Sequence, residues 1–353
     1  MAGLTAVHPP AGAVVGTLLD WARDLMEPAL RDAVTALPER ESRIAGYHRG
    51  WHEADGGARE DASSGRGGGK AVRPALVLLA AKAVGAPAAC AVPGAVGVEL
   101  IHDFSLLHDD VIDGDALRRH RPAAWTVYGT PAAVLTGDAL LVTALQVLAA
   151  APSSAAGAAV REALGMLGEL MRGQSQDVSF ETSGRVATEQ YLAMAEGKTG
   201  ALMGCACALG GLLGGAREDR VAGLRDFGRC LGVAFQCVDD LLGIWGTSGR
   251  SGKPVGADLA ARKKSLPVVA ALADDGPAGR RLAALYAQAD PFGEAEIALA
   301  TTLIEEAGGR ERTEQQVQRQ TSAAMRALTR AEPAAEVYRQ MQEIAALLTG
   351  RDH

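Results

Sequence analysis

Apolar side chains recur along most of the chain with the spacing of an α-helix. In the stretch from Leu18 to Met26, for example, Leu18, Ala22 and Leu25 fall three or four residues apart and share one helical face. Sustained alternation of apolar and polar positions, which would indicate half-buried strands, is hard to find. The pattern therefore predicts an all-α protein.

Clusters of Gly, Ser and Pro interrupt the helical pattern at residues 52–69, 151–157 and 246–256. Helical periodicity resumes directly after each interruption, so we interpret these segments as loops within one bundle rather than as interdomain linkers. About ten to thirteen helices fit the remaining sequence. We therefore predict a single domain over residues 1–353, with residues 1–40 forming an N-terminal helical segment that packs on it.

Composition supports close-packed helices and limits the classes of partner. Apolar residues make up 48% of the sequence but aromatic residues only 4%, so the core must be built chiefly from Ala, Leu and Val. A formal net charge of −7 argues against nonspecific binding to nucleic acid or to an anionic membrane surface. A phosphorylated substrate remains compatible with this charge, because a divalent metal ion can bridge acidic side chains to phosphate oxygens.

Cysteine usage and the N-terminal sequence predict a soluble cytoplasmic protein. The five cysteines show no CxxC or Cys/His spacing and are interpreted as reduced thiols. No basic region precedes the first apolar stretch, so a secretory signal is not expected. The most apolar run, Ala201 to Ala216, is shorter than the roughly 20 residues that span a bilayer, and we expect no integral membrane segment.

Three carboxylates cluster in the segment LLHDDVIDGDALRRHRP, at Asp109, Asp110 and Asp113. On a helix, Asp109 and Asp113 lie on one face about 6 Å apart, where bare carboxylates would repel each other. A helix cap or a solvated charged face could explain isolated acids, but these follow VELIHDFSLL, an apolar helix already under way. Hard oxygen ligands at this spacing suit Mg²⁺, which shares its site with substrate phosphates, so we predict a metal site here.

A second acidic pair, Asp239 and Asp240, lies in another apolar helical stretch, FQCVDDLLGIWG. If the two acidic helices face each other, their carboxylates can hold metal ions across the core of a bundle. Either pair alone would be weak evidence, and both together favour a metal site.

A separate pair of cations, Lys70 and Arg73, directly follows a run of glycines. The two residues are three apart, on one face of a predicted helix N-terminus whose free amides favour anions. The pair is therefore suited to binding an anion, with an ordinary solvated lysine as the alternative for Lys70.

Several segments, taken in chain order, resemble motifs of the trans-isoprenyl diphosphate synthases, which extend an allylic diphosphate with isopentenyl diphosphate. The segments are GGGKAVRP, DDVID, GDALRRHRP, EGKTG, FQCVDDLLG and GKPVGADLAARKKSLPVV. The resemblance extends from about residue 45 to the C-terminus. It implies an isoprenoid synthase-like bundle of helices around a central cavity, Mg²⁺ as cofactor, and a homodimer.

The resemblance also assigns roles at the allylic site. Loss of diphosphate leaves a delocalised carbocation, so charge on the leaving group must be stabilised. The implied Mg²⁺ ligands are Asp109, Asp113 and Asp239, supported by Asp110 and Asp240. The cations implied at the departing diphosphate are Arg118, Lys198 and Lys253, while Thr199 and Gln236 are implied as dipoles that steady the carbocation.

The second pocket, for isopentenyl diphosphate, is implied to consist of Lys70, Arg73, His102 and Arg119. Sequence chemistry alone would also allow His102 to be a hydrogen-bonded core histidine. The segment GQSQD, with Gln174 and Asp177, resembles another stretch that lines the family's cavity, and a polar core network is the alternative for it.

Product length is implied by the residues that precede the first acidic motif. The growing chain is expected to run past residues five to nine positions before Asp109, about 7 to 14 Å along the helix. Phe104, five positions before, resembles a bulky tunnel floor, and Ser105 beside it is small. This combination resembles synthases of the C20 product geranylgeranyl diphosphate, with C15 farnesyl diphosphate as the alternative. A Phe104 that merely packs between helices would carry no such meaning.

Gly243 departs from the family pattern, because the second acidic motif usually has a third aspartate at this position. A carboxylate there would lie four residues from Asp239 on the same helical face. From the sequence, Gly243→Asp is therefore expected to lower the Mg²⁺ concentration needed for turnover.

Two other functions fit parts of the pattern. A class I terpene cyclase on the same scaffold would ionise one diphosphate and would not need Lys70, Arg73 and Arg119. A noncatalytic partner subunit would tune another synthase and would not need an intact first acidic motif. Both are expected to be less suitable than an elongating synthase, because this chain keeps both sets of residues.

Overall fold

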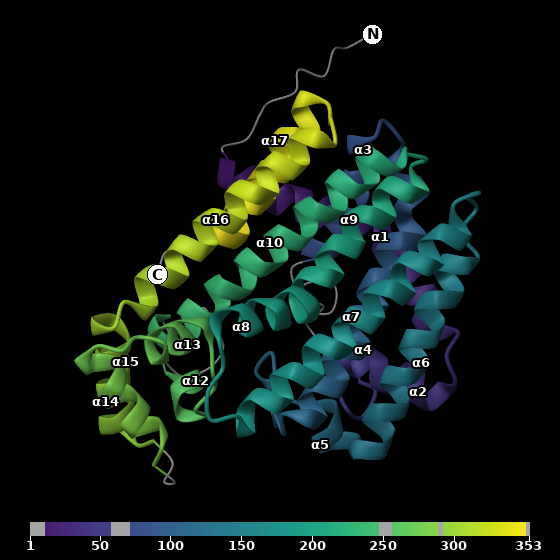
Figure 1. The fold of residues 1–353 in the computed structure, drawn as a ribbon. Coiled ribbons are helices and arrows are strands. Elements are labelled where there is room, and N and C mark those ends of the chain that lie inside the picture. The colour runs from purple at the N-terminus through teal and green to yellow at the C-terminus, as the bar shows by residue number, and fades with distance from the viewer. Residues whose placement is uncertain (1–10, 58–70, 247–255, 289–291, 351–353) are drawn as a thin grey trace. The chain divides into compact units, whose positions relative to one another are not determined.

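The computed structural model describes residues 11–57, 71–246, 256–288 and 292–350, which are helical almost throughout (Figure 1). The predicted all-α fold is confirmed. In chain order the helical segments are α1 (Ala11–Thr35), α2 (Glu39–His48), α3 (Val72–Ala83), η3 (Ala88–Ala91), α4 (Val92–Ile112), α5 (Ala124–Tyr128), α6 (Thr130–Ala149), α7 (Ala156–Thr182), α8 (Thr188–Ala195), η4 (Glu196–Gly200), α9 (Ala201–Leu213), α10 (Glu218–Trp245), α12 (Ala257–Ala260), α13 (Leu266–Leu272), α14 (Pro277–Tyr286), α15 (Glu294–Glu306), α16 (Gly309–Arg330) and α17 (Ala335–Thr349).

Two details of the secondary structure were not predicted from the sequence. Within the described ranges the helical segments outnumber the about ten to thirteen expected, because the sequence pattern does not distinguish short helices such as α5 and α12 from turns. A short antiparallel hairpin, β1 (Leu117–Arg118) and β2 (Arg121–Pro122), also follows α4.

The chain divides into two compact units. The first comprises the described residues up to Glu162, together with Ala206–Ala222 and Ala331–Ile344. The second comprises Ala163–Cys205, Gly223–Arg330 and the described residues from Ala345 onward. The single domain expected over residues 1–353 stays a prediction.

The core of the first unit is built around α3. Leu76, Val77, Leu78 and Leu79 are consecutive and all 0% exposed, so every face of this helix is covered. α1 and α4 pack against α3, and α9 approaches so closely that a Cβ on Gly210 would lie 2.1 Å from the backbone O of Val77. Glycine is therefore required where α9 crosses α3. Helix α4 packs on the same buried helix α3.

The second unit has its own core, in which α10 and α13 meet. Val238, Leu241, Leu266 and Val269 belong to one buried cluster together with Tyr191 of α8. A neighbouring cluster joins α13 to α14 and α15. Because these helices are fixed by apolar packing, the polar groups of α10 are held in fixed positions.

Two helical stretches are long and apolar enough to cross a membrane by length and composition alone, at Ala88–Ile112 and at Thr130–Ala149. In the first, 67% of the apolar window is buried inside the protein, which accounts for its composition without a membrane. In α6 the buried share is only 39%, because Leu135 and Val142 are exposed. The exposed face of α6 therefore needs another explanation.

Candidate active site

The first acidic segment lies at the C-terminal end of α4. The backbone N of Asp113 donates to the backbone O of Asp109 at 2.8 Å, so the helical turn continues and the two acids have the one-turn relation predicted for them. Asp109 is half-buried and Asp113 is exposed. Both carboxylates can therefore be reached from solvent.

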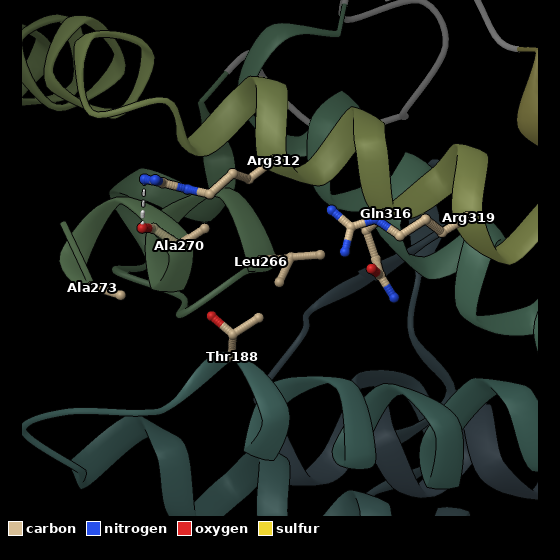
Figure 2. A pocket seen from close by; sticks show the side chains of 7 residues that line it. All are labelled: Thr188, Leu266, Ala270, Ala273, Arg312, Gln316 and Arg319. Atoms are coloured by element: carbon tan, nitrogen blue, oxygen red, sulfur yellow. Dashed lines mark hydrogen bonds between the residues drawn. The ribbon is translucent and has the colours of Figure 1, made fainter.

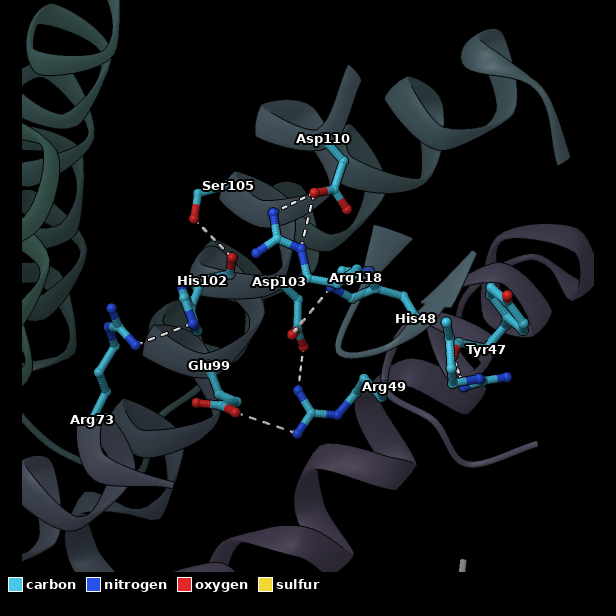
Figure 3. A network of polar contacts seen from close by, with 11 residues as sticks. Tyr47, His48, Arg49, Arg73, Glu99, His102, Asp103, Ser105, Asp110 and Arg118 are labelled. Atoms are coloured by element: carbon cyan, nitrogen blue, oxygen red, sulfur yellow. Dashed lines mark hydrogen bonds and ion pairs between the residues drawn. The ribbon is translucent and has the colours of Figure 1, made fainter. Parts of the chain in front are cut away.

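Asp110, the middle acid of the segment, is only 1% exposed. Its Oδ1 accepts a hydrogen bond from Nε of Arg118 at 2.9 Å and a second one from Nη2 (Figure 3). Burial raises the pKa of the Asp110 carboxyl, and the hydrogen bond from Arg118 opposes that shift. Its Oδ2 is also buried and has no hydrogen-bond partner within the described part of the chain. Asp110 thus orients Arg118 through one of its two carboxylate oxygens.

Arg118 and Arg119 are presented by the hairpin of β1 and β2. Arg118 pairs with Arg121, so the turn consists of Arg119 and His120, whose φ angles are 52° and 62°. Two-residue turns with positive φ favour glycine and asparagine, and other residues there carry strain of about 1 kcal/mol each. Arg121 anchors the hairpin by donating Nη1 to the backbone O of Tyr47 at 3.1 Å. The turn holds Arg119 exposed to solvent.

Arg73 and His102 meet beside this hairpin, as the predicted isopentenyl diphosphate pocket requires (Figure 3). Nη1 of Arg73, near the start of α3, lies 3.1 Å from Nε2 of His102 on α4. Burial lowers the pKa of His102 well below its usual range, and the charges of Arg73 and Arg119 add to the shift. His102 is therefore neutral, with Nε2 as the acceptor and the proton on Nδ1. Lys70 lies outside the described residues.

Phe104 lies between α4 and α6 and is 7% exposed. Its ring stacks edge to face on His108, with 4.7 Å between the ring centroids. A Cβ on Gly137 of α6 would come within 3.5 Å of the Phe104 ring. These contacts are those of a packed aromatic residue, and the tunnel floor at Phe104 stays a prediction.

In the second unit, the segment EGKTG forms η4, a π-helical turn between α8 and α9. Such turns are rare, interrupt regular helical hydrogen bonding, and occur often at functional sites. A Cβ on Gly173 of α7 would lie 2.4 Å from the backbone N of Lys198, and a Cβ on Gly232 of α10 would lie 2.7 Å from Cα of Gly200. Two glycines on neighbouring helices therefore make room for the turn.

Lys198, in the middle of η4, points its ammonium group toward α7. Its Nζ donates to Oδ2 of Asp177 at 2.6 Å. Nε2 of Gln174, one turn earlier on α7, is buried and has no hydrogen-bond partner within the described ranges. The structure thus brings together Lys198 and the segment GQSQD, which the sequence linked to the same cavity.

Thr199 begins a chain of buried hydrogen bonds. Its Oγ1 donates to Oε1 of Gln236 at 2.7 Å, and Nε2 of Gln236 donates to Oδ1 of Asp240 at 3.1 Å. Oδ2 of Asp240 accepts from the Tyr191 hydroxyl and from the backbone N of Leu266, the latter at 2.9 Å. Burial raises the pKa of Asp240 to about 7, and these hydrogen bonds oppose the rise. Both oxygens of Asp240 are therefore engaged within the protein.

Asp239 differs from Asp240 in being half-buried rather than buried. One turn further along α10, a Cβ on Gly243 would lie 2.0 Å from Oδ2 of Asp258 and 2.7 Å from its Cγ. The carboxylate of Asp258 thus occupies the space that a side chain at position 243 would enter. A carboxylate from α12 is therefore already placed where Gly243→Asp would add one, and the expected change in Mg²⁺ requirement stays a prediction. Lys253 lies outside the described residues.

Sequence reasoning missed Tyr191 and Asp258, which contact Asp240 and Gly243 respectively. Tyr191 carried a weak signal, as a phenol on the otherwise apolar turn that precedes EGKTG. Asp258 stood in a quoted segment, GKPVGADLAARKKSLPVV, but no spacing rule links it to a helix that ended twelve or more residues earlier. Only the folded structure brings Asp258 next to Gly243.

No group of three or more His, Cys, Asp or Glu side chains in the described part of the chain is arranged to enclose a metal ion. Mg²⁺ does not need such a cage, because it keeps several waters and is usually bound through one or two carboxylates and substrate phosphates. Asp109 and Asp113 on one turn are such a donor set, and Asp239 lies one turn before Gly243, where the carboxylate of Asp258 is placed. The chemistry of the residues present therefore fits Mg²⁺.

A separate pocket of about 220 Å³ lies in the second unit, among α8, α13 and α16 (Figure 2). It is lined by Thr188, Leu266, Ala270, Ala273, Arg312, Gln316 and Arg319. Nη2 of Arg312 donates to the backbone O of Ala270 at 2.9 Å. This hydrogen bond links α16 to α13, so the guanidinium is engaged within the protein. None of the site residues predicted from the sequence lines this pocket.

Comparisons with known proteins agree on one family. A family model described as polyprenyl synthetase matches residues 63–304. A geranylgeranyl diphosphate synthase from Mycobacterium tuberculosis is 45% identical over 293 residues, which cover 83% of this chain and 82% of that protein. A (2E,6E)-farnesyl diphosphate synthase from Mycobacterium bovis is also 45% identical, over 296 residues that cover 83% of this chain and 81% of that protein.

A solved structure gives the same picture. A polyprenyl synthetase from Streptomyces coelicolor matches with a TM-score of 0.90 and 45% identity, over 95% of this chain and 99% of that one. The matched region includes both acidic segments. The two mycobacterial relatives are named for different products, geranylgeranyl diphosphate and farnesyl diphosphate.

The position of the Asp258 carboxylate generates a prediction for stability. Gly243→Asp is expected to lower the free energy of unfolding by about 1 to 2 kcal/mol, because it displaces that carboxylate and sets two like charges together. The double variant Gly243→Asp with Asp258→Ala should regain most of the loss. Denaturant unfolding followed by circular dichroism measures both changes.

Gly165→Asp is the matched control, since nothing lies within 4 Å of a Cβ at Gly165. It should differ from wild type by no more than about 0.5 kcal/mol. A Gly243→Asp protein as stable as wild type would show that Asp258 does not occupy this space in solution.

Proposed function

Because the chain belongs to the polyprenyl synthetase family, we propose that it is a short-chain prenyl diphosphate synthase that condenses isopentenyl diphosphate with an allylic diphosphate. The observation that carries the proposal is the order of side chains on α4, where His102 precedes Asp109 by two helical turns. Both side chains therefore project from one face, about 10 Å apart. Helix α4 thus contributes His102 to a proposed pocket that binds one diphosphate without metal, and Asp109 to an acidic turn that binds the other through Mg²⁺. A reaction between two diphosphate substrates needs both sites.

The two alternative functions leave one of these features unexplained. A class I terpene cyclase ionises a single diphosphate and has no use for the contact between Arg73 and His102. A noncatalytic partner subunit has no use for Asp109 and Asp113 on an accessible turn. Elongation uses both.

We propose Asp109, Asp113 and Asp239 as the Mg²⁺ ligands, because they are the acids of the two motifs that solvent can reach. Asp110 and Asp240 are proposed to orient their neighbours instead, since each is buried and hydrogen-bonded. Asp258 is proposed to supply the carboxylate that the second motif lacks at position 243. Bound Mg²⁺ would neutralise the charge that develops on the departing diphosphate.

The remaining residues of the second unit are proposed to handle the leaving group and the carbocation. Lys198 binds the departing diphosphate, and Asp177 holds the ammonium group in place until substrate arrives. Thr199 and Gln236 offer oxygen dipoles that stabilise positive charge without forming a covalent bond. Their mutual hydrogen bond, fixed through Asp240 and Tyr191, keeps these dipoles preorganised.

In the first unit, Arg73, His102 and Arg119 are proposed to bind isopentenyl diphosphate, with Lys70 completing the set. A neutral His102 accepts from Arg73 and so fixes the guanidinium orientation without adding charge. Arginine suits this task because its planar fork donates two hydrogen bonds to a phosphate at once. Arg118 is proposed to contact the allylic diphosphate while it remains bound to Asp110.

We propose geranylgeranyl diphosphate as the main product and a cytoplasmic location. The product assignment is supported by Phe104 on α4, five residues before Asp109, and by a relative named geranylgeranyl diphosphate synthase. The location is supported by the cysteines, which are all free thiols.

We further propose that the chain forms a homodimer through exposed apolar stripes. On α6, Leu135 and Val142 are 57% and 54% exposed. On α7, Leu164, Met171 and Val178 are 51%, 53% and 39% exposed. Residues seven apart stay on one helical face, as in helices that associate side by side. Stripes of this length are unusual on a monomer and suit an equivalent helix of a second copy.

The function is tested by incubating purified protein with Mg²⁺, isopentenyl diphosphate and each allylic diphosphate in turn. A linear prenyl diphosphate is expected, and Asp109→Ala and Asp239→Ala should each retain less than a few per cent of the wild-type rate, because each removes a proposed metal ligand. Circular dichroism checks that both variants remain folded. A cyclic or hydrocarbon product would contradict elongation, and an active Asp109→Ala enzyme would contradict the metal assignment.

Phe104→Ala is expected to shift the products toward longer chains, because it removes the side chain that is predicted to end the tunnel. Chromatography of the dephosphorylated alcohols measures the distribution. Phe104→Leu serves as a milder variant, because Phe→Ala in a core costs about 3 to 5 kcal/mol. Phe292→Ala, equally buried at 7%, is the control and should leave chain length unchanged. An unaltered distribution in both Phe104 variants would place the floor elsewhere.

The dimer is tested by charging the stripe on α7. The double variant Leu164→Glu with Met171→Glu is expected to be monomeric in sedimentation or light scattering, because carboxylates do not desolvate in an apolar interface. Leu299→Glu is the control, since Leu299 is 39% exposed but belongs to neither stripe. A wild-type protein that is monomeric at micromolar concentration would contradict the proposed homodimer.

A further inference from the structure

A buried ion cluster adjoins the proposed isopentenyl diphosphate pocket, where α2 meets α4 (Figure 3). Arg49, which follows the last residue of α2, is 3% exposed, while Asp103 and Glu99 of α4 are 0% and 4% exposed. Nη1 of Arg49 donates to Oδ2 of Asp103, and Nη2 donates to Oε1 of Glu99 at 3.4 Å. Because Glu99 and Asp103 are four residues apart on one helical face, a single guanidinium contacts both.

A buried ion pair is weak evidence of a contribution to stability, because desolvation of two charges offsets much of their attraction. Two apolar side chains of similar volume would fill the same space without the free-energy cost of desolvating charges. The position of the cluster is more informative. Asp103 directly follows His102, the residue that accepts a hydrogen bond from Arg73.

The two carboxylates act electrostatically on the cations of the pocket. Burial raises the pKa of Glu99, and the positive charges of Arg49, Arg73 and Arg119 oppose that rise. Desolvation of the guanidinium group lowers the pKa of Arg119, and the carboxylates of Asp103 and Glu99 act in the opposite direction. The buried acids and the pocket cations therefore influence one another electrostatically.

His48 lies next to this set but does not neutralise it. Burial lowers the pKa of His48 to about 4, so the ring is uncharged near neutral pH. Its Nε2 is 3.8 Å from Oδ1 of Asp103, beyond hydrogen-bond distance. The charge that balances Asp103 is therefore that of a guanidinium, and the one in contact with it is that of Arg49.

We propose that Arg49 is a positioning residue for the isopentenyl diphosphate pocket, an inference that rests on the proposed function. Arg49 neutralises the charge of Asp103 and contacts Glu99, so Arg73 and Arg119 do not have to supply that positive charge as well as binding a diphosphate. Without Arg49, Glu99 and Asp103 draw these two guanidinium groups toward the core and cancel their charge. Arg49 itself is buried and does not touch the substrate.

The experiment compares four variants in steady-state kinetics, with each substrate varied separately at fixed Mg²⁺. Arg49→Met is expected to raise the KM for isopentenyl diphosphate at least about tenfold and to leave the KM for the allylic substrate within about twofold. Arg49→Lys keeps the charge and should stay within about threefold of wild type for both. Arg43→Met, the same substitution at an exposed position of α2, should behave as wild type.

The fourth variant, Arg49→Met with Asp103→Leu, removes the pair together and restores the charge balance. Its KM for isopentenyl diphosphate should return to within about threefold of wild type. If Arg49→Met alone does not fold, this variant and Arg49→Lys carry the test. Equal rises in both KM values, or a double variant as weak as Arg49→Met, would overturn the proposal, because a merely structural role predicts those outcomes.

A direct measurement separates this inference from the proposed function. Calorimetric titration with inorganic diphosphate in the absence of Mg²⁺ reports the metal-free pocket without any turnover. Arg49→Met should weaken this binding about tenfold, and the double variant should regain it. If the wild-type protein forms no prenyl diphosphate, the proposed function fails, whereas unchanged diphosphate binding in Arg49→Met defeats the role of Arg49.

Discussion

Charge that is buried between helices has to be matched locally, because an ion removed from water costs several kcal/mol unless other groups replace its hydration. In the first unit, this constraint fixes which elements surround α4. Arg49 at the end of α2 meets Asp103 and Glu99, while Arg118 of the hairpin meets Asp110. The guanidinium groups thereby connect α2 and the hairpin to the helix that carries the first acidic motif.

The same constraint gives the two aspartates of each adjacent pair different surroundings. Consecutive residues on a helix point about 100° apart, so one acid of a pair faces the core when the other faces outward. Asp110 and Asp240 face inward, are buried, and accept hydrogen bonds from Arg118 and from Tyr191 and Gln236. Asp109 and Asp239 are left half-buried, where a metal ion can reach them. Identical residue types thus have different burial and different hydrogen-bond partners because of helical geometry.

Much of this protein could be predicted from local sequence. Helical periodicity gave the all-α fold, because an amphipathic helix records its buried face in its own spacing. The acidic turn of Asp109 and Asp113 was also accessible, from i, i+4 geometry, and resemblance to a known family placed Arg73 and His102 in one pocket before the structure showed their contact. The comparisons then confirmed that resemblance.

Contacts between elements far apart in the chain were decided only by the tertiary structure. The carboxylate of Asp258 lies over Gly243, Tyr191 donates to Asp240, and Arg49 meets Asp103. No spacing rule predicts such contacts, because each depends on how whole helices pack and not on the period of any one of them. The sequence by itself therefore determined the all-α fold and placed the two acidic segments on apolar helices. Packing decided which acids are buried, which cations balance them, and which glycine makes room for a distant carboxylate.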